Sequence, residues 1–587
     1  MKKKSILYHS QLLPLYIGIT GHRDIREEDK ESLKLLLKEF IEEKQKQCTH
    51  TPVVILTPLA EGADRIAAFA AIDCAIDFIA VLPMPVEEYK KDFTLNESVT
   101  EFESLLAKAS LIIELPLQEE TTIELVSKDI EKRNEQYYQN GLFIARQCHT
   151  LVAFWDGTDN GKKGGTADVV KLKKSGIPGK FESTSKRLRY LQTGSIFHII
   201  TPRKNSPVPQ KHLSAHMHYP AHFNGDDDKA KKNEKDTLER IDSFNKDVTK
   251  LGSVLKGKIK KNAKRLCSNC PDIENNQIMQ IIAEKHGISG ELANYFQNRR
   301  FIAVKILLTL VVLAFLFLYI NSEFLHQPLI LLLYPITMGI GAIWFLFAKW
   351  QKYECKHEDY RALSEAYRIQ FFLTACGKRE NASDHYLKRH RGQLEWVLYA
   401  LRSLQITEWK YNSTSTYSGI NNRMNLFVFL KINWVDDQLK YFKKSTIRHN
   451  HSSKIWGLRA NRSFIGAILA ACLLFLVSYN SEVLPENLIS YDGILRSILS
   501  CCTSVFLVLA AALHGYSDKM IFAEQAKNYQ QMTQLFELAS ETLNHAIETN
   551  DENEANDIIM ELAQEALLEN GDWLLLHRSR PLEIPKG

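Results

Sequence analysis

The chain has 587 residues, more than one ordinary hydrophobic core holds, so we expect at least two independent units. The net charge of +5 at pH 7 is small for this length and gives no reason to expect a nucleic-acid partner. Only two of the ten cysteines, Cys267 and Cys270, have a spacing typical of metal ligands. No second Cys or His pair lies near them in the sequence, so we expect no metal site.

Residues 1–205 alternate short apolar runs with helical patterns. The runs are rich in β-branched residues and cover 15–20, 53–58, 77–82, 111–115, 149–155 and 197–201. Short buried strands that alternate with amphipathic helices indicate a parallel sheet with helices on both faces. The sequence therefore predicts an α/β, Rossmann-like N-terminal domain that binds its ligand at the carboxyl ends of the strands.

Candidate ligand-binding residues follow three of these strands. They are Gly21, His22 and Arg23 after the first strand, Glu61, Gly62 and Asp64 after the second, and Asp156, Gly164, Gly165 and Thr166 after the fifth. Glycines at a helix start allow backbone N–H groups to cradle a phosphate, and carboxylates can accept from ribose hydroxyls. Each loop could instead be a plain turn with helix caps. Three such loops on one sheet favour a nucleotide pocket.

The middle of the chain has two kinds of sequence. Residues 206–236 are rich in Pro, His, Asp and Lys and predict a mobile linker. Residues 237–298 and 381–460 repeat apolar residues at helical spacing and predict cytoplasmic helices. The basic stretch at 443–462 either lies near anionic lipid headgroups or forms a solvated face, and the sequence leaves both open.

Four apolar stretches are each about as long as a helix that crosses ~30 Å of hydrocarbon. They cover residues 301–320, 328–348, 463–479 and 493–514. We therefore expect two two-span hairpin units: residues 299–380, with a cytoplasmic helix, and 461–587, with C-terminal helices.

Charge predicts how these spans are oriented. Lys and Arg lie just before the first and third spans and just after the second and fourth. The hairpin tips at 321–327 and 480–492 contain no Lys. By the positive-inside rule, the head, the middle region and both termini are expected in the cytoplasm.

The two hairpins also resemble each other in sequence. Asn298-Arg299-Arg300 precedes the first and Asn461-Arg462 the second, and Asn-Ser-Glu follows Tyr319 in one tip and Tyr479 in the other. A duplicated two-span unit explains entry and tip in the same order. Coincidence between short strings is the alternative.

Several segments resemble known families. LAEGADRIAAFAA resembles the Rossmann-like segment of DNA-processing protein A. YYQNGLFIARQCHTLVAFWDG together with GKKGGTADVV is similar to the SLOG superfamily, over about residues 14–203. YRALSEAYR at 360–368 resembles the SLATT two-span effectors, and ENGDWL with HRSRP at 569–581 is typical of the same group.

The resemblance implies a membrane effector of a bacterial antiphage or conflict system. A SLOG head would bind a nucleotide or NAD-derived second messenger and gate membrane disruption or pore formation. The protein would then be a homo-oligomer in the inner membrane, in contact with its lipids and without a cofactor.

The alternative is a membrane-anchored nucleotide N-glycosidase or phosphoribohydrolase in which Asp168 or Glu61 polarises water. Phosphoribohydrolases carry a Glu after GGxGT, whereas this chain has a shortened GGTA followed by Asp168. That departure favours binding over catalysis, so we assign no catalytic residue.

Overall fold

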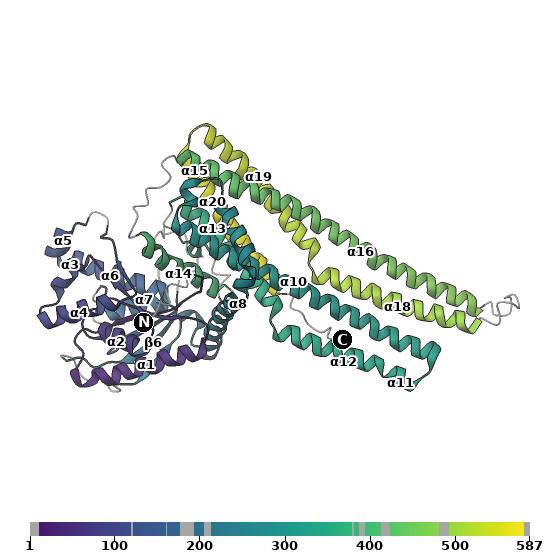
Figure 1. Cartoon of the computed structure of the whole chain (residues 1–587), viewed down its shortest axis with the longest axis horizontal. Coiled ribbons are helices and arrows are strands. Elements are labelled where there is room, and N and C mark those ends of the chain that lie inside the picture. Colours follow the sequence, from purple (N-terminus) through teal and green to yellow (C-terminus); the bar gives the residue numbers. More distant parts are fainter. Residues whose placement is uncertain are drawn as a thin grey trace. The chain divides into compact units, whose positions relative to one another are not determined.

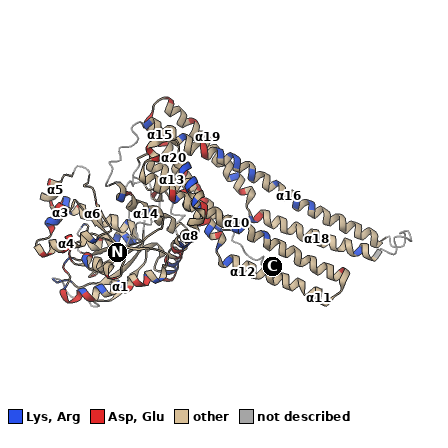
Figure 2. Cartoon of the chain, viewed as in Figure 1, with Lys and Arg blue, Asp and Glu red and all other residues tan. Residues whose placement is uncertain are grey.

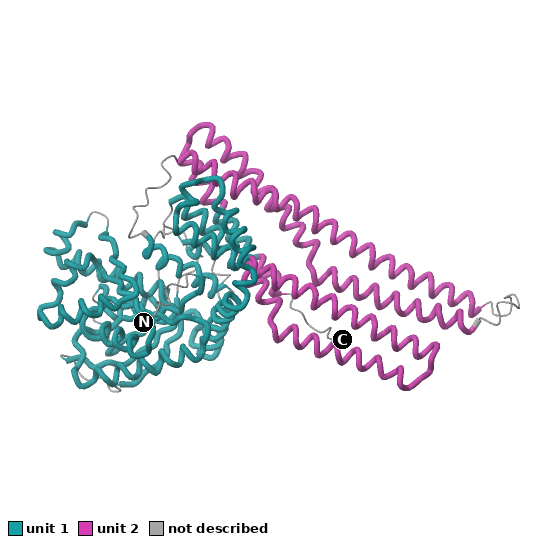
Figure 3. Tube along the Cα trace, in the orientation of Figure 1, with its two compact units in different colours: residues 1–290, 362–421, 563–572 teal, residues 291–361, 422–562, 573–587 magenta. Residues whose placement is uncertain are grey.

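The computed structural model describes residues 11–118, 121–159, 161, 163–176, 193–204, 213–377, 381–386, 392, 394–412, 423–479 and 492–579. The predicted tip at 480–492 lies almost wholly outside these residues, as do part of the predicted linker and the end of the HRSRP segment. The chain divides into two compact units (Figure 3). Unit 1 holds residues 1–290, 362–421 and 563–572, and unit 2 holds 291–361, 422–562 and 573–587.

Unit 1 contains a seven-stranded sheet with the strand order β4-β3-β2-β1-β5-β6-β7 (Figure 1). Its strands are β1 (Leu15–Gly21), β2 (Val53–Thr57), β3 (Asp77–Leu82), β4 (Leu111–Glu114), β5 (Thr150–Trp155), β6 (Ser195–Ile200) and β7 (Ala215–His218). All neighbouring strands are parallel except β6 and β7. The predicted α/β class and all six predicted strands are confirmed. The order reverses between β1 and β5, which makes their carboxyl ends the topological switch point.

Helices cover both faces of this sheet, so its inner strands β1, β2, β3 and β5 are largely buried, whereas the edge strands β4 and β7 are partly exposed. The helices are α1 (Lys30–Gln47), α2 (Ala63–Asp73), α3 (Val86–Tyr89), α4 (Asn96–Lys108), α5 (Ile123–Lys128), α6 (Ile130–Gln147), α7 (Thr166–Ser175), α8 (Asp227–Cys267), α9 (Pro271–Glu274) and α14 (Glu395–Asn412). Ile17 and Ile19 of β1 join the core cluster that includes the apolar residues of α1 and α2. Gly18, on the opposite face, lets α6 approach closely, since a Cβ there would lie 2.7 Å from Ile144.

Unit 1 extends beyond the predicted 1–205 domain, and the predicted linker at 206–236 is partly regular structure. Strand β7 pairs with β6, and α8 begins at Asp227. The Asn245 amide on α8 bonds both the N–H and the carbonyl of Leu13, each at 2.8 Å. The Tyr399 hydroxyl on α14 accepts from the Tyr16 N–H at 2.7 Å and donates to Pro14 at 2.9 Å. These buried bonds fix α8 and α14 to the start of β1.

Unit 2 is helical. Its helices are α10 (Gln277–Ile320), α11 (Pro328–Leu331), α12 (Leu333–Trp350), α13 (Tyr353–Ala375), α15 (Arg423–Leu430), α16 (Asp436–Tyr479), α18 (Asp492–Lys519), α19 (Phe522–Glu548) and α20 (Glu552–Arg578). By their ranges, α10, α13 and α20 each include residues of both units. Four helical segments are long and apolar enough to span a membrane, and they contain the four predicted spans. Figure 2 shows few charged residues along these apolar parts.

The two hairpins share one backbone feature that the sequence does not reveal. The second span of each ends at a residue in the left-handed conformation, Lys352 (φ 52°) and Ile521 (φ 52°). A new helix follows directly in both cases, α13 after Lys352 and α19 after Ile521. Two non-glycine residues in this rare conformation at matching places support the predicted duplication.

Candidate functional site

A cavity of about 900 Å³ lies at the switch point of the sheet, within the size range of ligand pockets. It is lined by the loops after β1, β2 and β5, by one face of α6 and by the start of α7. Seven of the ten predicted residues line it: Gly21, His22, Arg23, Asp64, Gly164, Gly165 and Thr166. We refer to it as the switch-point cavity.

The loop after β1 is held in place by its own glycine. A Cβ on Gly21 would lie 2.4 Å from the Ala63 Cβ and 2.7 Å from the Phe154 Cβ. The His22 N–H donates to the Phe154 carbonyl at 3.1 Å, and the His22 carbonyl accepts from the Ala63 N–H at 3.1 Å. Gly21 is therefore required for the approach of α2 and β5 to β1, rather than for contact with an anion.

The Nε2 atom of His22 meets both the backbone and the carboxylate of Asp156, the latter at 3.3 Å. Burial lowers the pKa of His22, although the Asp156 carboxylate acts to raise it. The Nε2 atom accepts a hydrogen bond from the Asp156 N–H at 3.0 Å, which only an unprotonated nitrogen can do. His22 thus holds the loop after β5 through Nε2. The other ring nitrogen, Nδ1, takes no part in this contact.

Asp64 is the carboxylate best placed to meet a ligand. It lies in the first turn of α2, lines the cavity and is only 6% exposed. The Ala60 N–H donates to Oδ2 at 3.3 Å, whereas Oδ1 is buried and has no partner in the described residues. Burial raises the pKa of Asp64 to about 7, although the charge of Arg23 opposes this shift.

Asn140 of α6 is a second buried group with an unused acceptor. Its Nδ2 donates to the Val81 carbonyl at 2.7 Å, and its Oδ1 has no partner among the described residues. The side chain is 2% exposed and lines the cavity. Since unpaired buried acceptors are costly, Asp64 and Asn140 together fit a ligand that donates hydrogen bonds to both.

The start of α7 is the predicted phosphate cradle. The Gly164 N–H donates to Asp168 Oδ2 at 3.1 Å, so Asp168 acts as a cap. Gly164 has φ +76°, and a Cβ there would lie 2.8 Å from the Tyr138 nitrogen. Gly165 is extended, at φ −74°, and offers no side-chain cap to the helix. The first-turn N–H groups of α7 lack intrahelical partners and carry the positive end of the helix dipole.

Three cations border the same cavity. The Arg23 guanidinium lies 5.1 Å from the centre of the Tyr137 ring and 3.9 Å from Asp92. Arg203 pairs with Asp24 at 2.9 Å, and Lys163 pairs with Glu135. Asp24 and Asp159 line the cavity as well. The three cations and the α7 N-terminus are the groups in its wall that suit phosphate.

Three predicted residues do not line the cavity. Glu61 accepts a short hydrogen bond from the Ser98 hydroxyl. Gly62 (φ +79°) is a tight turn, where a Cβ would lie 2.5 Å from the carbonyl oxygens of His22 and Arg23. Asp156 accepts from the Thr158 N–H at 3.0 Å and from its hydroxyl at 2.7 Å. Burial acts to raise the pKa of Asp156, but these bonds outweigh it and keep the pKa low.

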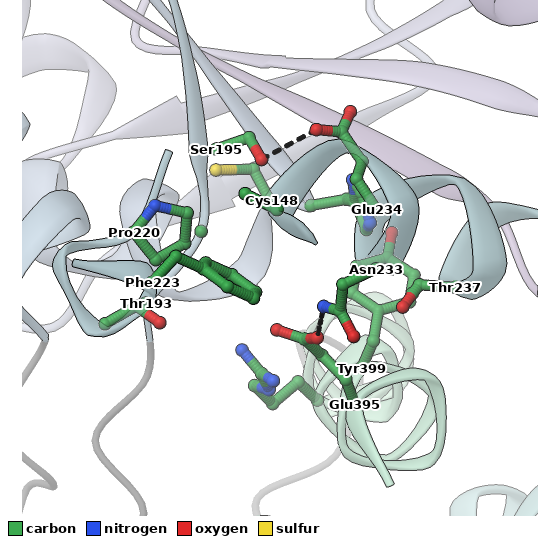
Figure 4. A pocket seen from close by; sticks show the side chains of 14 residues that line it. Cys148, Thr193, Ser195, Pro220, Phe223, Asn233, Glu234, Thr237, Glu395 and Tyr399 are labelled. Carbon is green, nitrogen blue, oxygen red and sulfur yellow. Dashed lines mark hydrogen bonds between the residues drawn. The ribbon is translucent and has the colours of Figure 1, made fainter. Parts of the chain in front are cut away.

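A second cavity lies near the amino ends of β5 and β6 (Figure 4). Ser195 donates to Glu234 at 2.8 Å, Asn233 donates to Glu395, and Glu234 also pairs with Lys44 at 3.0 Å. Burial lowers the pKa of His149 in its wall to about 4. Its volume of about 40 Å³ has room for a water molecule or two but not for a nucleotide.

Comparison with known proteins gives no match, whether with family models, with curated proteins or with solved structures. No group of three metal-ligating side chains occurs in the part of the chain that the structure describes. The switch-point cavity and the four apolar helices are therefore the features that bear on function.

Proposed function

We propose that this protein is a ligand-gated membrane effector. Binding of a nucleotide or NAD-derived second messenger in the switch-point cavity alters the four-span region, and the bilayer then loses its permeability barrier. One observation carries the proposal: a cavity of about 900 Å³ with two buried acceptors that have no partner among the described residues occurs in a chain with four candidate membrane spans. A membrane anchor needs one span, so four are better explained by a membrane activity.

The chemistry of the cavity suits such a ligand. Phosphates would lie between the start of α7 and the cations Arg23, Arg203 and Lys163. Sugar hydroxyls or an exocyclic amino group would donate to Asp64 and Asn140. The resemblance to SLOG and SLATT proteins favours a bacterial antiphage or conflict system in the inner membrane. The positive-inside pattern favours cytoplasmic termini, so the cavity would meet signals made in the cytoplasm.

Within unit 2, a partly buried ion cluster joins the two hairpins at the ends of the candidate spans that lie away from the tips. Glu354 of α13 lies 2.8 Å from the Arg300 guanidinium of α10 and 3.5 Å from the Lys519 ammonium of α18. Val304 of α10 packs beside this cluster against Tyr516 and Met520 of α18. We call these residues, Arg300, Val304, Glu354, Tyr516, Lys519 and Met520, the hairpin junction.

A further bond joins the hairpins at their other end. Ser500 of α18 donates to Glu323, in the π-helical turn that follows α10, at 3.0 Å. The hairpins are thus tied at both ends, and their separation requires the loss of buried polar contacts. Since α10 and α13 each include residues of both units, a change in unit 1 can reach the junction along a continuous helix. The gate would open when the junction is released.

A second candidate function is hydrolysis of the bound nucleotide, because a carboxyl with a pKa of about 7 is matched to proton transfer at neutral pH. Asp64 would then be the acid or base. The residues first considered for this role are poorly placed, since Glu61 does not line the cavity and Asp168 caps α7.

Binding and recovery of the ligand test the two functions. Purified protein in detergent is incubated with adenine dinucleotides, ADP-ribose derivatives and cyclic nucleotides, and thermal stabilisation is recorded. A compound that stabilises the protein is then recovered and analysed by mass spectrometry. The effector proposal predicts stabilisation with the compound intact. Cleavage that Asp64→Asn abolishes would favour the hydrolase, and a panel without any stabilising compound would contradict both.

A further inference from the structure

The half of α16 that precedes its apolar run has an exposed basic face, which Figure 2 shows as blue residues along that helix. We call this face the basic stripe. It consists of Lys440, Lys444, Ile447, His451, Lys454 and Leu458. Successive members are three or four residues apart, so they share one side of the helix. Ile447 is 71% exposed and Leu458 54% exposed, which is unusual for aliphatic side chains on a fixed helix.

The opposite side of α16 is packed against its own chain. The Phe442 ring lies 5.3 Å from the Phe536 ring of α19, and the Trp456 ring lies 4.7 Å from the Tyr516 ring of α18. These contacts hold the basic stripe outward. Lys443, at its edge, pairs with Glu537 of α19. The three lysines of the basic stripe make no ion pair within the described residues.

Membrane lipids are out of reach for most of the basic stripe. Helix α16 is continuous from Asp436 to Tyr479, and its apolar run begins at Ser463. At 1.5 Å per residue, Lys440 lies about 35 Å and His451 about 18 Å from the start of that run. Electrostatic attraction to headgroups is screened over about 8 Å at physiological salt. Of the two interpretations of residues 443–462, lipid contact therefore suits only the end near Arg459 and Arg462.

Helix α20 carries a face of opposite charge with the same helical spacing. Glu554, Asp557 and Glu561 are three and four residues apart and thus share one side of the helix. Asp557 and Glu561 are exposed and Glu554 is half-buried. None of the three has an ion pair in the part of the chain that is described. We call these residues the acidic stripe.

We propose that the basic stripe of one copy docks on the acidic stripe of a second copy. The two faces have opposite charge and lie on different helices of unit 2, so a second copy can pair with them either reciprocally across a two-fold axis or head-to-tail. Repeated head-to-tail contacts close into a ring when the rotation between copies allows it. Ile447 and Leu458 would be covered by the neighbouring subunit, which explains their exposure in the single chain. The inference is independent of the ligand and holds whether or not the protein is gated.

The test is the mass of the full chain in detergent, measured by mass photometry, for two charge-reversed triples. One is Lys440→Glu, Lys444→Glu and Lys454→Glu, and the other is Glu554→Lys, Asp557→Lys and Glu561→Lys. The control triple, Lys250→Glu, Lys256→Glu and Lys260→Glu, reverses exposed lysines of α8 and changes the net charge as much as the α16 triple does. We expect the wild type and the control to be oligomers. Each test triple should fall to the monomer mass of 67.4 kDa.

Mixing the two test variants distinguishes a loss of docking from misfolding. The α16 triple keeps its acidic stripe and the α20 triple keeps its basic stripe, so a mixture of the two again offers complementary faces. We expect the mixture to regain the oligomer mass, and high salt to reduce it. A wild type that is monomeric, a test triple that stays oligomeric, or a mixture that stays monomeric would overturn the proposal.

Discussion

Arg300 and Glu354 form an ion pair with 2.8 Å between Nη2 and Oε1, in a chain whose four candidate membrane spans carry few charges. Arg300 is only 6% exposed, and Lys519 of the other hairpin lies 3.5 Å from the same Glu354 oxygen. One carboxylate therefore holds cations from both hairpins. Its loss would leave a buried guanidinium unpaired, which costs about 3–5 kcal/mol in proteins.

Glu354→Gln tests whether this contact keeps the membrane region closed. The amide keeps the shape of the side chain but removes the charge that attracts Arg300 and Lys519. We expect dye to leak from liposomes that carry the variant, without any ligand. Asp518→Asn is the matched control, because it removes a carboxylate of an exposed pair with His514, next to Lys519 in the sequence. If liposomes that carry either variant retain their dye, the hairpin junction does not restrain the hairpins.

Gly165→Asp tests the phosphate cradle. The extended backbone of Gly165 accepts any residue, and Asp is a favourable helix N-cap, so α7 should remain folded. The new carboxylate would repel a phosphate at the start of α7. We expect the ligand concentration for half-maximal response to rise about 10-fold or more, equivalent to about 1.4 kcal/mol.

Gly165→Asn provides the neutral comparison for this position, since it has nearly the same shape and also caps helices well. We expect the ligand concentration for half-maximal response of this variant to be much closer to that of the wild type. Equal losses in the Asp and Asn variants would mean that bulk rather than charge is responsible, and the anionic part of the ligand would then lie elsewhere.

Asp64→Asn should change how stability depends on pH. The folded state raises the pKa of Asp64 from 3.8 to about 7, so it binds this proton more tightly than the unfolded state. Stability is therefore lost as pH rises from about 4 to 7 and is constant above that range. The full effect is about 4 kcal/mol, at 1.36 kcal/mol per pKa unit.

The measurement for Asp64 is thermal unfolding of the full chain in detergent at pH 5 and pH 8. We expect Asp64→Asn to gain melting temperature relative to the wild type, and to gain more at pH 8 than at pH 5. A difference that is the same at both pH values would mean that Asp64 is already ionised in the folded protein at pH 5.

Glu234→Gln tests the small cavity of Figure 4 as a structural element. Lys44 is 6% exposed and would lose its charged partner, while His149 and Ser195 remain nearby. We expect a loss of about 3–5 kcal/mol in unit 1 and a clearly lower melting temperature. Asp73→Asn removes an exposed carboxylate that pairs with two half-buried lysines of α1 and should change stability by less than about 1 kcal/mol. Equal effects of the two substitutions would contradict a structural role for the buried pair.

The sequence predicted most of the α/β sheet and all four apolar helices because these depend on local patterns. It missed β7, whose four residues Ala215–His218 include two histidines and form an edge strand that pairs only with β6. It could not include α8 and α14 in unit 1, since they are held there by single buried contacts such as Asn245 with Leu13. Contacts of this kind depend on positions far apart in the sequence.

The prediction of the site was incomplete for a similar reason. Residues after a strand end are near the ligand, but the sequence does not say which way each side chain points. Glu61 turns to Ser98, and Asp156 to Thr158. Asn140 and Arg203 were missed because one lies within α6 and the other follows β6, away from the glycine-rich loops. The polar Asn140 within the apolar pattern of α6 was the only available signal.

Dye release from liposomes that carry the purified full chain measures whether ligand binding opens the membrane. Compounds that stabilise the protein are added, release is recorded, and each compound is recovered for mass spectrometry. We predict release with the compound intact, at a concentration close to that of the wild type for Gly165→Asn and at a concentration about 10-fold or more higher for Gly165→Asp. A compound that binds or is cleaved while the liposomes remain sealed would contradict the account.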